Sequence, residues 1–138
     1  MSDHKATIEA MYAAFGRGDV AAILERLSPD VAWEQWPDLS AQAAGVPWLQ
    51  ERHGREGALE FFKIVGQWKF QEFRVASIMT GGNDVAVLII VDAEIPGSGV
   101  RMRDEEMHLW TFGADGLVAR FRHYADTAKH IAAARAGA

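Results

Sequence analysis

Two histidines and two carboxylates in the C-terminal half of the chain have the residue types that acid–base chemistry requires. His108, His123 and Glu106 lie within residues 105–126, and Asp92 follows a run of apolar residues. An imidazole titrates near neutral pH, and a carboxylate that fixes its tautomer makes it a usable acid or base. We therefore predict His108, His123 and Asp92 as catalytic residues. The alternative for each is a structural role in a hydrogen bond, an ion pair or a solvent-facing position.

A β-hairpin is expected to bring these side chains together. The sequence Gly-Ala-Asp-Gly after Phe112 is typical of a tight turn, and the residues on both sides of it alternate between two faces. If Phe112 pairs with Leu117, the register sets Glu106 opposite His123. His108 then lies on the same face, two residues away, or about 7 Å along the strand. Both imidazole rings could reach one ligand atom without touching each other.

The two faces of this hairpin differ in chemistry. The first mixes imidazoles and a carboxylate with aromatic rings, which is typical of a pocket wall with a few polar groups. It carries Glu106, His108, Trp110, Ala119, Phe121 and His123. The second face is half apolar and half guanidinium, so it is either a solvated sheet face or the interface of a homodimer, which we predict. It carries Met107, Leu109, Thr111, Val118, Arg120, Arg122 and Tyr124.

The order of the expected elements indicates an α+β fold. The spacing of apolar residues changes from a helical period to a period of two near Lys69. Helices are expected at 3–16, at 19–27 and from about 55–57, and strands at 31–36, 70–80, 84–95, 100–112 and the second half of the hairpin. These elements predict a curved, mostly antiparallel sheet wrapped around three N-terminal helices. We expect one domain, residues 1–138.

Three segments are less regular. Residues 38–52 follow Pro37, contain one further proline and a glycine, and are expected to form a loop with one short helical turn around Trp48. A bulge or bend is expected near 103–105. An alanine-rich helical tail is expected at 127–136.

Aromatic side chains from several elements could line a cavity between the sheet and the helices. Each could equally pack in the core, but together they suit a flat, apolar ligand such as a polycyclic or terpenoid compound. Gln35 joins them because it shares a strand face with Trp33. The predicted substrate-binding residues are Tyr12, Phe15, Trp33, Gln35, Trp48, Glu106, Trp110 and Phe121.

Charge and composition disfavour several classes of protein. The formal net charge of −5, without a cluster of Lys or Arg, disfavours nucleic acid as a partner. There is no cysteine, no apolar run long enough for a membrane span and no signal peptide, so we expect a cytoplasmic protein. Neither an HxH nor an HExxH spacing occurs, and no glycine-rich nucleotide motif has its strand–turn–helix context. We therefore predict no metal and no cofactor.

Several short sequences resemble the nuclear-transport-factor-2-like, ketosteroid-isomerase-like superfamily, and within it the SnoaL-type polyketide cyclases. They are YAAFGRGD at 12–19, LSPDVAW at 27–33, GREG at 54–57, HLWTF at 108–112 and YAD at 124–126. The resemblance covers essentially the whole chain and implies the cone-shaped α+β fold, a pocket that includes a tyrosine of the first helix, and dimerisation through the sheet.

The resemblance also assigns roles to individual positions. His108 falls where steroid isomerases carry an oxyanion-hole aspartate and where the polyketide cyclases carry a histidine. Gln35 falls where the isomerases carry their general base, and an amide cannot abstract a proton. Arg122 falls where the cyclases carry an acidic catalyst, and Asp92 resembles an aspartate of limonene epoxide hydrolase. Each known chemistry of the superfamily therefore lacks a part here.

Three functions follow from these observations. The first is a small-molecule enzyme that performs acid–base chemistry, as an isomerase, cyclase, dehydratase or hydrolase, on an apolar substrate. The second is a binding module that holds a lipophilic ligand without reaction. The third is an adaptor whose pocket is filled by its own aromatic side chains. An open cavity with at least two titratable side chains near one point would favour the enzyme.

Overall fold

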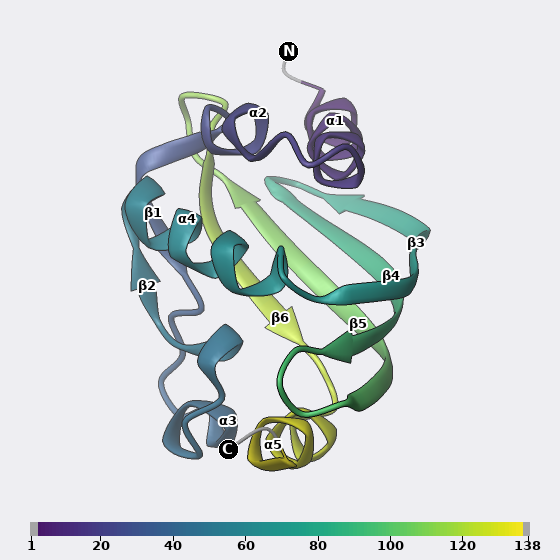
Figure 1. Ribbon diagram of the computed structural model, residues 1–138. Helices are drawn as coiled ribbons and strands as arrows, with labels where there is room; N and C mark the ends of the chain where they lie inside the picture. The colour runs from purple at the N-terminus through teal and green to yellow at the C-terminus, as the bar shows by residue number, and fades with distance from the viewer. Residues whose placement is uncertain (1–2, 137–138) are drawn as a thin grey trace.

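The computed structural model describes residues 3–136 and shows a curved six-stranded sheet with helices packed against it (Figure 1). The strand order is β2-β1-β6-β5-β4-β3. The helices are α1 (His4–Gly16), α2 (Val20–Leu24), α3 (Ser40–Ala43), the 3₁₀ helix η1 (Pro47–Leu49), α4 (Gly54–Val65) and α5 (Thr127–Ala136). The strands are β1 (Leu27–Trp33), β2 (Arg52–His53), β3 (Lys69–Gly81), β4 (Asp84–Ile95), β5 (Val100–Phe112) and β6 (Val118–Tyr124). The predicted α+β fold with a curved, mostly antiparallel sheet is confirmed, and the sheet does not close into a barrel.

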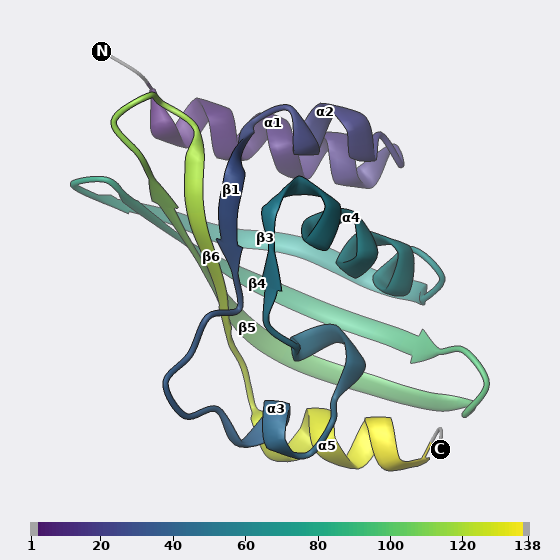
Figure 2. The same ribbon diagram turned by 90° about the vertical axis from the view of Figure 1, so that its left-hand side faces the viewer.

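Helices occupy both ends of the sheet as well as its middle. In Figures 1 and 2, α1 and α2 lie at one end, α3 and α5 at the other, and α4 between them. The side chains of Asp3 and Asp19 accept hydrogen bonds from Ala6 N and Ala22 N and so cap α1 and α2. Among residues 3–136, no helix has both the length and the apolar character to cross a membrane.

Strand β1 differs from its prediction at both ends. It begins at Leu27 and contains Pro29, which was expected only to end the preceding helix. Pro29 is tolerated because the parallel pairing of β1 with β6 is interrupted between Leu27 and Ala32, where no ladder hydrogen bond is lost. The strand stops at Trp33 instead of residue 36. Glu34 follows with φ of 55°, which turns the chain out of the sheet.

The loop and the bulge were predicted incompletely. The helical turn around Trp48 is present as η1, but α3 and β2 were not expected. The predicted bulge near 103–105 is absent, because β4 and β5 pair without interruption from Asp84↔Thr111 to Ile95↔Val100. Interruptions occur instead in the pairing of β3 with β4, at residues 71 and 76. The helical tail is confirmed as α5.

The register of the last hairpin is shifted by two residues from the prediction. Phe112 pairs with Val118, and Ala119 is then an extra residue, since Thr111 pairs with Arg120. His108 therefore lies directly opposite His123 instead of two residues away. A bulge adds one residue to one strand, which alternation alone cannot reveal.

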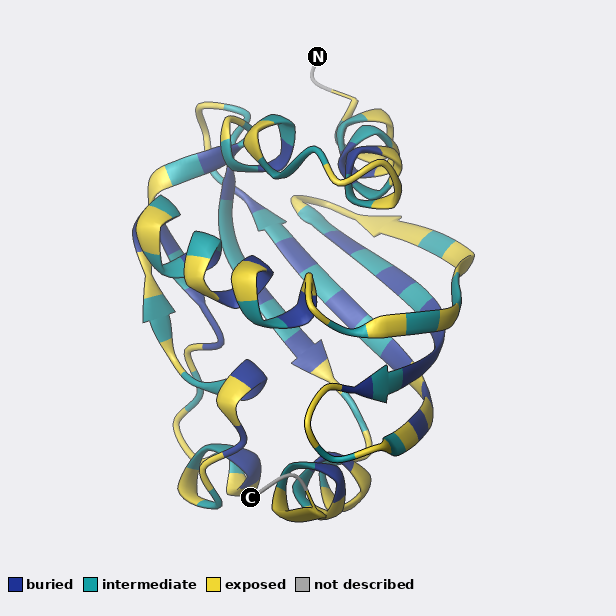
Figure 3. Ribbon diagram, in the orientation of Figure 1, coloured by how far each residue is buried: buried dark blue, intermediate teal, exposed yellow. Residues whose placement is uncertain are grey.

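The inner faces of β4, β5 and β6 form the floor of the core. Val87 and His108 are partners across the sheet, as are Ile89 and Glu106. The inner residues of these strands are buried, and β3 carries most of the exposed positions (Figure 3). Ala86 and Leu88 of β4 are only half-buried, so the outer face is less covered than the continuous apolar sequence of β4 predicted. Polar groups on the inner face are therefore held among apolar and aromatic neighbours.

Candidate functional site

A cavity of about 70 Å³ lies between the inner sheet face and helices α1 and α4. Its wall is mostly aromatic, and its titratable groups are Tyr12, Glu106, His108 and His123. Of the predicted pocket residues, those that line it are Tyr12, Phe15, Trp33, Trp48, Glu106, His108, Trp110, Phe121 and His123. Gln35 and Asp92 do not. The sequence therefore predicted half of the residues that line the cavity, while the catalytic roles remain predictions.

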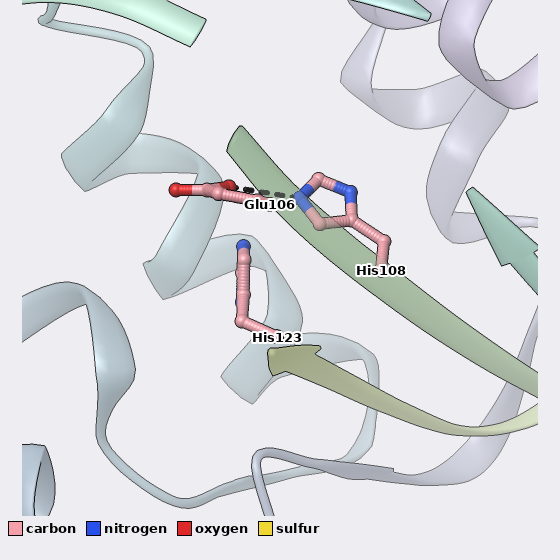
Figure 4. Close-up of side chains that lie close together, drawn as sticks. All are labelled: Glu106, His108 and His123. Carbon is pink, nitrogen blue, oxygen red and sulfur yellow. Dashed lines mark hydrogen bonds and ion pairs between the residues drawn. The ribbon is translucent and has the colours of Figure 1, made fainter. Parts of the chain in front are cut away.

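One side of the cavity carries a chain of three hydrogen bonds. Trp110 Nε1–H donates to the Tyr12 hydroxyl over 3.0 Å, and that hydroxyl lies 2.6 Å from His108 Nδ1. His108 Nε2 lies 3.0 Å from Glu106 Oε2 (Figure 4). Tyr12 and His108 are 96 positions apart in the sequence, so α1 and β5 must dock to form this contact.

The protonation states along this chain follow from its geometry. Burial raises the pKa of Tyr12, so the phenol stays protonated and donates its proton to His108 Nδ1. Burial also lowers the pKa of His108, and we assign this ring as neutral, with its proton on Nε2 facing Glu106. Burial alone would raise the pKa of Glu106, but hydrogen bonds from His108 and His130 outweigh it and hold that pKa well below its usual range.

His123 is oriented by a carboxylate that the sequence reading did not single out. Glu34, which is 0% exposed, accepts the His123 backbone N–H at 2.6 Å and lies 3.2 Å from Nδ1 of the same ring. Burial lowers the pKa of His123, but the charge and the hydrogen bond of Glu34 raise it by more, so the net pKa is above the ordinary value. With Nδ1 engaged by Glu34, Nε2 is the nitrogen left for the cavity. In Figure 4 the His123 ring points toward Glu106 and His108.

Behind Glu106 lies a second layer of polar groups from α5 and η1. His130 Nε2 is 2.8 Å from Asp104 Oδ2 and 3.2 Å from Glu106 Oε1. Trp48 Nε1–H donates to His130 Nδ1 over 2.9 Å, so Nδ1 carries no proton and the His130 proton sits on Nε2. His130 therefore holds Glu106 in place from outside the cavity.

Asp92 occupies the opposite face of the sheet from the two histidines, so the prediction that it joins them is wrong. It pairs with Arg103 across β4 and β5, and its two carboxylate oxygens lie 2.7 and 2.8 Å from Arg101 Nε and Nη2. The hydrogen bond from Arg101 lowers the pKa of Asp92. This bidentate ion pair lies outside the cavity, so Asp92 does not share a site with His108 and His123.

Gln35 is exposed because β1 ends three residues earlier than expected. The positive φ of Glu34 reverses the expected alternation, so that Glu34 turns inward and Gln35 turns outward. No clear sequence signal pointed to Glu34, because it was expected inside a strand that continued to residue 36. Asp104 and His130 gave no signal, since their contact depends on how α5 docks against β5.

Two groups of residues have the ligand types for a metal ion. Glu106, His108 and His123 each offer one ligand atom, and these atoms lie within 4.8 Å of one another. Asp104, Glu106 and His130 form the second group. The first group faces the cavity, whereas the second lies behind it.

Known proteins share features of this sequence and this fold. Residues 8–121 match the model of the SnoaL-like domain. A search of curated proteins found no match. Among solved structures, an NTF2-like protein of unknown function from Burkholderia pseudomallei is 27% identical with a TM-score of 0.74, and the alignment covers 96% of this chain and 97% of that one.

Two further solved structures share the fold. TerC, co-crystallised with polyporic acid, is 23% identical with a TM-score of 0.74, covering 97% of this chain and 99% of its own. A computationally designed 17-OHP binder is 13% identical with a TM-score of 0.65, covering 86% and 89%. At these identities the likeness concerns the fold alone, whereas the family model spans most of the sequence. The chain belongs to the SnoaL-like domain family.

Proposed function

We propose that the protein is a small-molecule enzyme that transfers protons to and from a compact, largely apolar substrate. The observation that carries this proposal is the position of the His123 ring. Glu34 lies against its Nδ1, and its Nε2 is left for the aromatic cavity beside His108. A carboxylate that fixes one imidazole nitrogen leaves the other to accept or deliver a proton. The apolar wall keeps water away and strengthens each electrostatic contact.

The roles of the polar groups follow from their partners. His123 is the proton-transferring residue. The chain from Trp110 through Tyr12 and His108 to Glu106 fixes one side of the cavity, because each of its donors already has an acceptor within the chain. Trp33 supplies a donor for a substrate oxygen, because its buried indole N–H has no partner among the described residues and it lines the same cavity. A substrate oxygen that accepted this N–H would remove the penalty of leaving it unpaired.

The reaction class is removal of a proton from a carbon next to a carbonyl group. That step is common to double-bond isomerisation and aldol-type cyclisation. A small-molecule substrate is consistent with the structure of TerC, which shares the fold and was co-crystallised with polyporic acid. The cavity of about 70 Å³ is small beside typical ligand pockets of roughly 300–1,000 Å³. A single-ring substrate therefore fits best, and a larger one requires the aromatic wall to move.

The test is hydrogen–deuterium exchange at the α-carbon of cyclopentanone, cyclohexanone and 2-indanone, followed by NMR in deuterated buffer with chelator present. We expect the protein to accelerate exchange of at least one ketone, and His123→Ala to reduce that acceleration by about 10²–10⁴-fold. His53→Ala is the matched control, since His53 is exposed and outside the cavity. If wild type and His123→Ala give the same rate, with both folded by circular dichroism, the proposal fails.

A second candidate is a non-catalytic binding module for a lipophilic small molecule. It is favoured by the fact that both nitrogens of His108 are engaged, so that His123 alone offers an open imidazole nitrogen. Trp33, Trp48, Trp68 and Trp110 line the cavity, so their fluorescence reports ligand entry. A saturable fluorescence change with the same ketones, without accelerated exchange, would favour this function.

We further propose that the outer face of the sheet forms a homodimer interface. Met79 and Tyr124 are 44% and 43% exposed, and the half-buried Met107 and Leu109 lie on the same face. Exposed apolar side chains that adjoin across neighbouring strands support an interface between two copies of the chain.

A further inference from the structure

We propose that Glu106, His108 and His123 form a binding site for one divalent transition-metal ion. Their ligand atoms lie within 4.8 Å of one another, and His108 Nε2 is 3.0 Å from Glu106 Oε2 (Figure 4). Two imidazoles and one carboxylate that converge from one side leave further coordination positions open, here toward the cavity. The inference goes beyond the proposed function, which needs no metal.

The sheet itself holds the three ligands. Glu106 and His108 are two residues apart on β5 and therefore share a face, and His123 is the direct partner of His108 on β6. Paired strands in a ladder fix the separation of such side chains. The pattern differs from the i, i+4 spacing by which helices present two metal ligands.

Each ligand is also held from behind by a second polar group. Glu34 lies 3.2 Å from Nδ1 of His123, and the Tyr12 hydroxyl lies 2.6 Å from Nδ1 of His108. Outer contacts of this kind fix the tautomer and the ring orientation of metal-binding histidines.

The carboxylate ligand is supported in the same way. His130 lies 3.2 Å from Glu106 Oε1, the oxygen that does not face His108. Glu106 therefore keeps Oε2 for an ion in the cavity. All three proposed ligands thus have the outer support that an engineered or natural metal site requires.

Metal binding needs a change of tautomer at His108 and an unprotonated Nε2 at His123. The single His108 proton would move from Nε2 to Nδ1, from which it would donate to the Tyr12 oxygen, and any proton on His123 Nε2 would be released to solvent. That oxygen already accepts the N–H of Trp110, so its own O–H would turn toward the cavity. Trp110 and His108 keep their partners after this change, whereas the Tyr12 O–H would need a new acceptor among the ion's other ligands in the cavity.

The charge of the surrounding residues favours a cation. Glu34, Asp104 and Glu106 are buried carboxylates, and Lys129, whose Nζ is 3.9 Å from Asp104 Oδ1, is the ammonium group paired with this cluster in residues 3–136. An added divalent ion would offset the excess of buried negative charge. Nitrogen ligands select zinc, iron, cobalt or nickel over magnesium and calcium, which prefer oxygen alone.

The alternative group of Asp104, Glu106 and His130 is less suitable. His130 Nε2 already donates to both carboxylates, and Trp48 fixes that tautomer by donating to Nδ1. An ion bound by His130 Nε2 would break the contacts of that nitrogen with Asp104 and Glu106. It would also move the His130 proton to Nδ1, where it would face the Trp48 N–H. It would also have no open cavity beside it for additional ligands.

The test uses the full chain after EDTA treatment and desalting, titrated with Co²⁺ under anaerobic conditions. We expect one Co²⁺ per chain with visible absorption bands of a nitrogen- and oxygen-ligated ion. His108→Ala, His123→Ala and Glu106→Gln should weaken binding by at least about 100-fold, and Glu34→Gln by about 10–100-fold. His53→Ala should bind as wild type does. Equal affinity in wild type and the ligand variants would place the ion elsewhere and overturn the proposal, as would the absence of one-to-one binding.

A measurement on the wild-type protein covers the case in which a variant fails to fold. With ¹⁵N-labelled histidine, added Zn²⁺ should shift the Nε2 resonances of His108 and His123 and leave those of His53 unchanged. Unshifted resonances would overturn the metal site. Because ketone exchange is measured with chelator present, a metal site that fails leaves the proposed enzyme function untouched, and the reverse also holds.

Discussion

Removing the Glu34 carboxylate should be among the most damaging single changes to this protein. Glu34 is 0% exposed and serves two hydrogen bonds of His123, one to the backbone N–H at 2.6 Å and one to Nδ1 at 3.2 Å. Glu34→Ala leaves a buried N–H unpaired, at about 1–3 kcal/mol, and breaks a buried carboxylate–imidazole pair. Breaking such pairs by removing one partner costs about 3–5 kcal/mol, which we take as the expected loss in the free energy of unfolding.

Two companion variants separate the causes of this loss. Glu34→Gln keeps an acceptor for the backbone N–H and removes only the charge, so we expect a loss of about 1–2 kcal/mol, the difference between charged and neutral hydrogen bonds. Glu34→Gly removes the side chain but suits a φ of 55°, where an L-residue is strained by about 1–2 kcal/mol. Glu34→Gly should therefore be more stable than Glu34→Ala by about 1 kcal/mol.

The assay is urea unfolding followed by tryptophan fluorescence and by circular dichroism, with the slope of the transition compared among the variants. The expected order of stability is wild type, Glu34→Gln, Glu34→Gly and Glu34→Ala. A loss below about 1 kcal/mol for Glu34→Ala would show that the buried contact with His123 contributes little. A Glu34→Gly variant less stable than Glu34→Ala would refute the role of backbone strain.

Two further predictions concern the outer face of the sheet. Asp92→Asn should lower the thermal midpoint at pH 7. Because the folded pKa of Asp92 lies below its ordinary value, the ion pair with Arg101 stabilises the fold above the unfolded pKa of about 3.9. That contribution is lost as the pH falls through the folded pKa, so the difference between the two midpoints should shrink as the pH is lowered below the unfolded pKa. A difference that stays constant would contradict the assignment. Leu109→Arg should convert a wild-type dimer into a monomer in light scattering, and a wild-type monomer at micromolar concentration would rule out the proposed interface.

The sequence predicted the fold well because its main signals are local. The change of apolar period near Lys69 and the turn after Phe112 each act over a few residues. The strands predicted at 84–95 and 100–112 and the helix predicted at 127–136 are those observed. The same locality explains the errors. The extra residue at Ala119 and the positive φ at Glu34 depend on how β6 and β1 meet, which no local pattern records.

The candidate site was predicted in part for the same reason. His108, His123 and Glu106 share a face in any register that keeps the alternation, so their grouping survived a shift of two residues. The shift made the two histidines direct partners and brought their ring centroids to 4.6 Å. Asp92 was misplaced because the residue after an apolar run was assumed to share the pocket face. In fact Val91, its neighbour, lines the cavity.

The buried polar network is itself an argument for function. Glu34, Asp104 and Glu106 lie inside the fold, with His108, His123 and His130 as their partners. Apolar residues of similar volume at such positions commonly give equal or greater stability, because burying charged groups carries a large desolvation penalty. The network is therefore not explained by stability alone. It holds two imidazoles at fixed distances in a dry cavity, as proton transfer or metal binding requires.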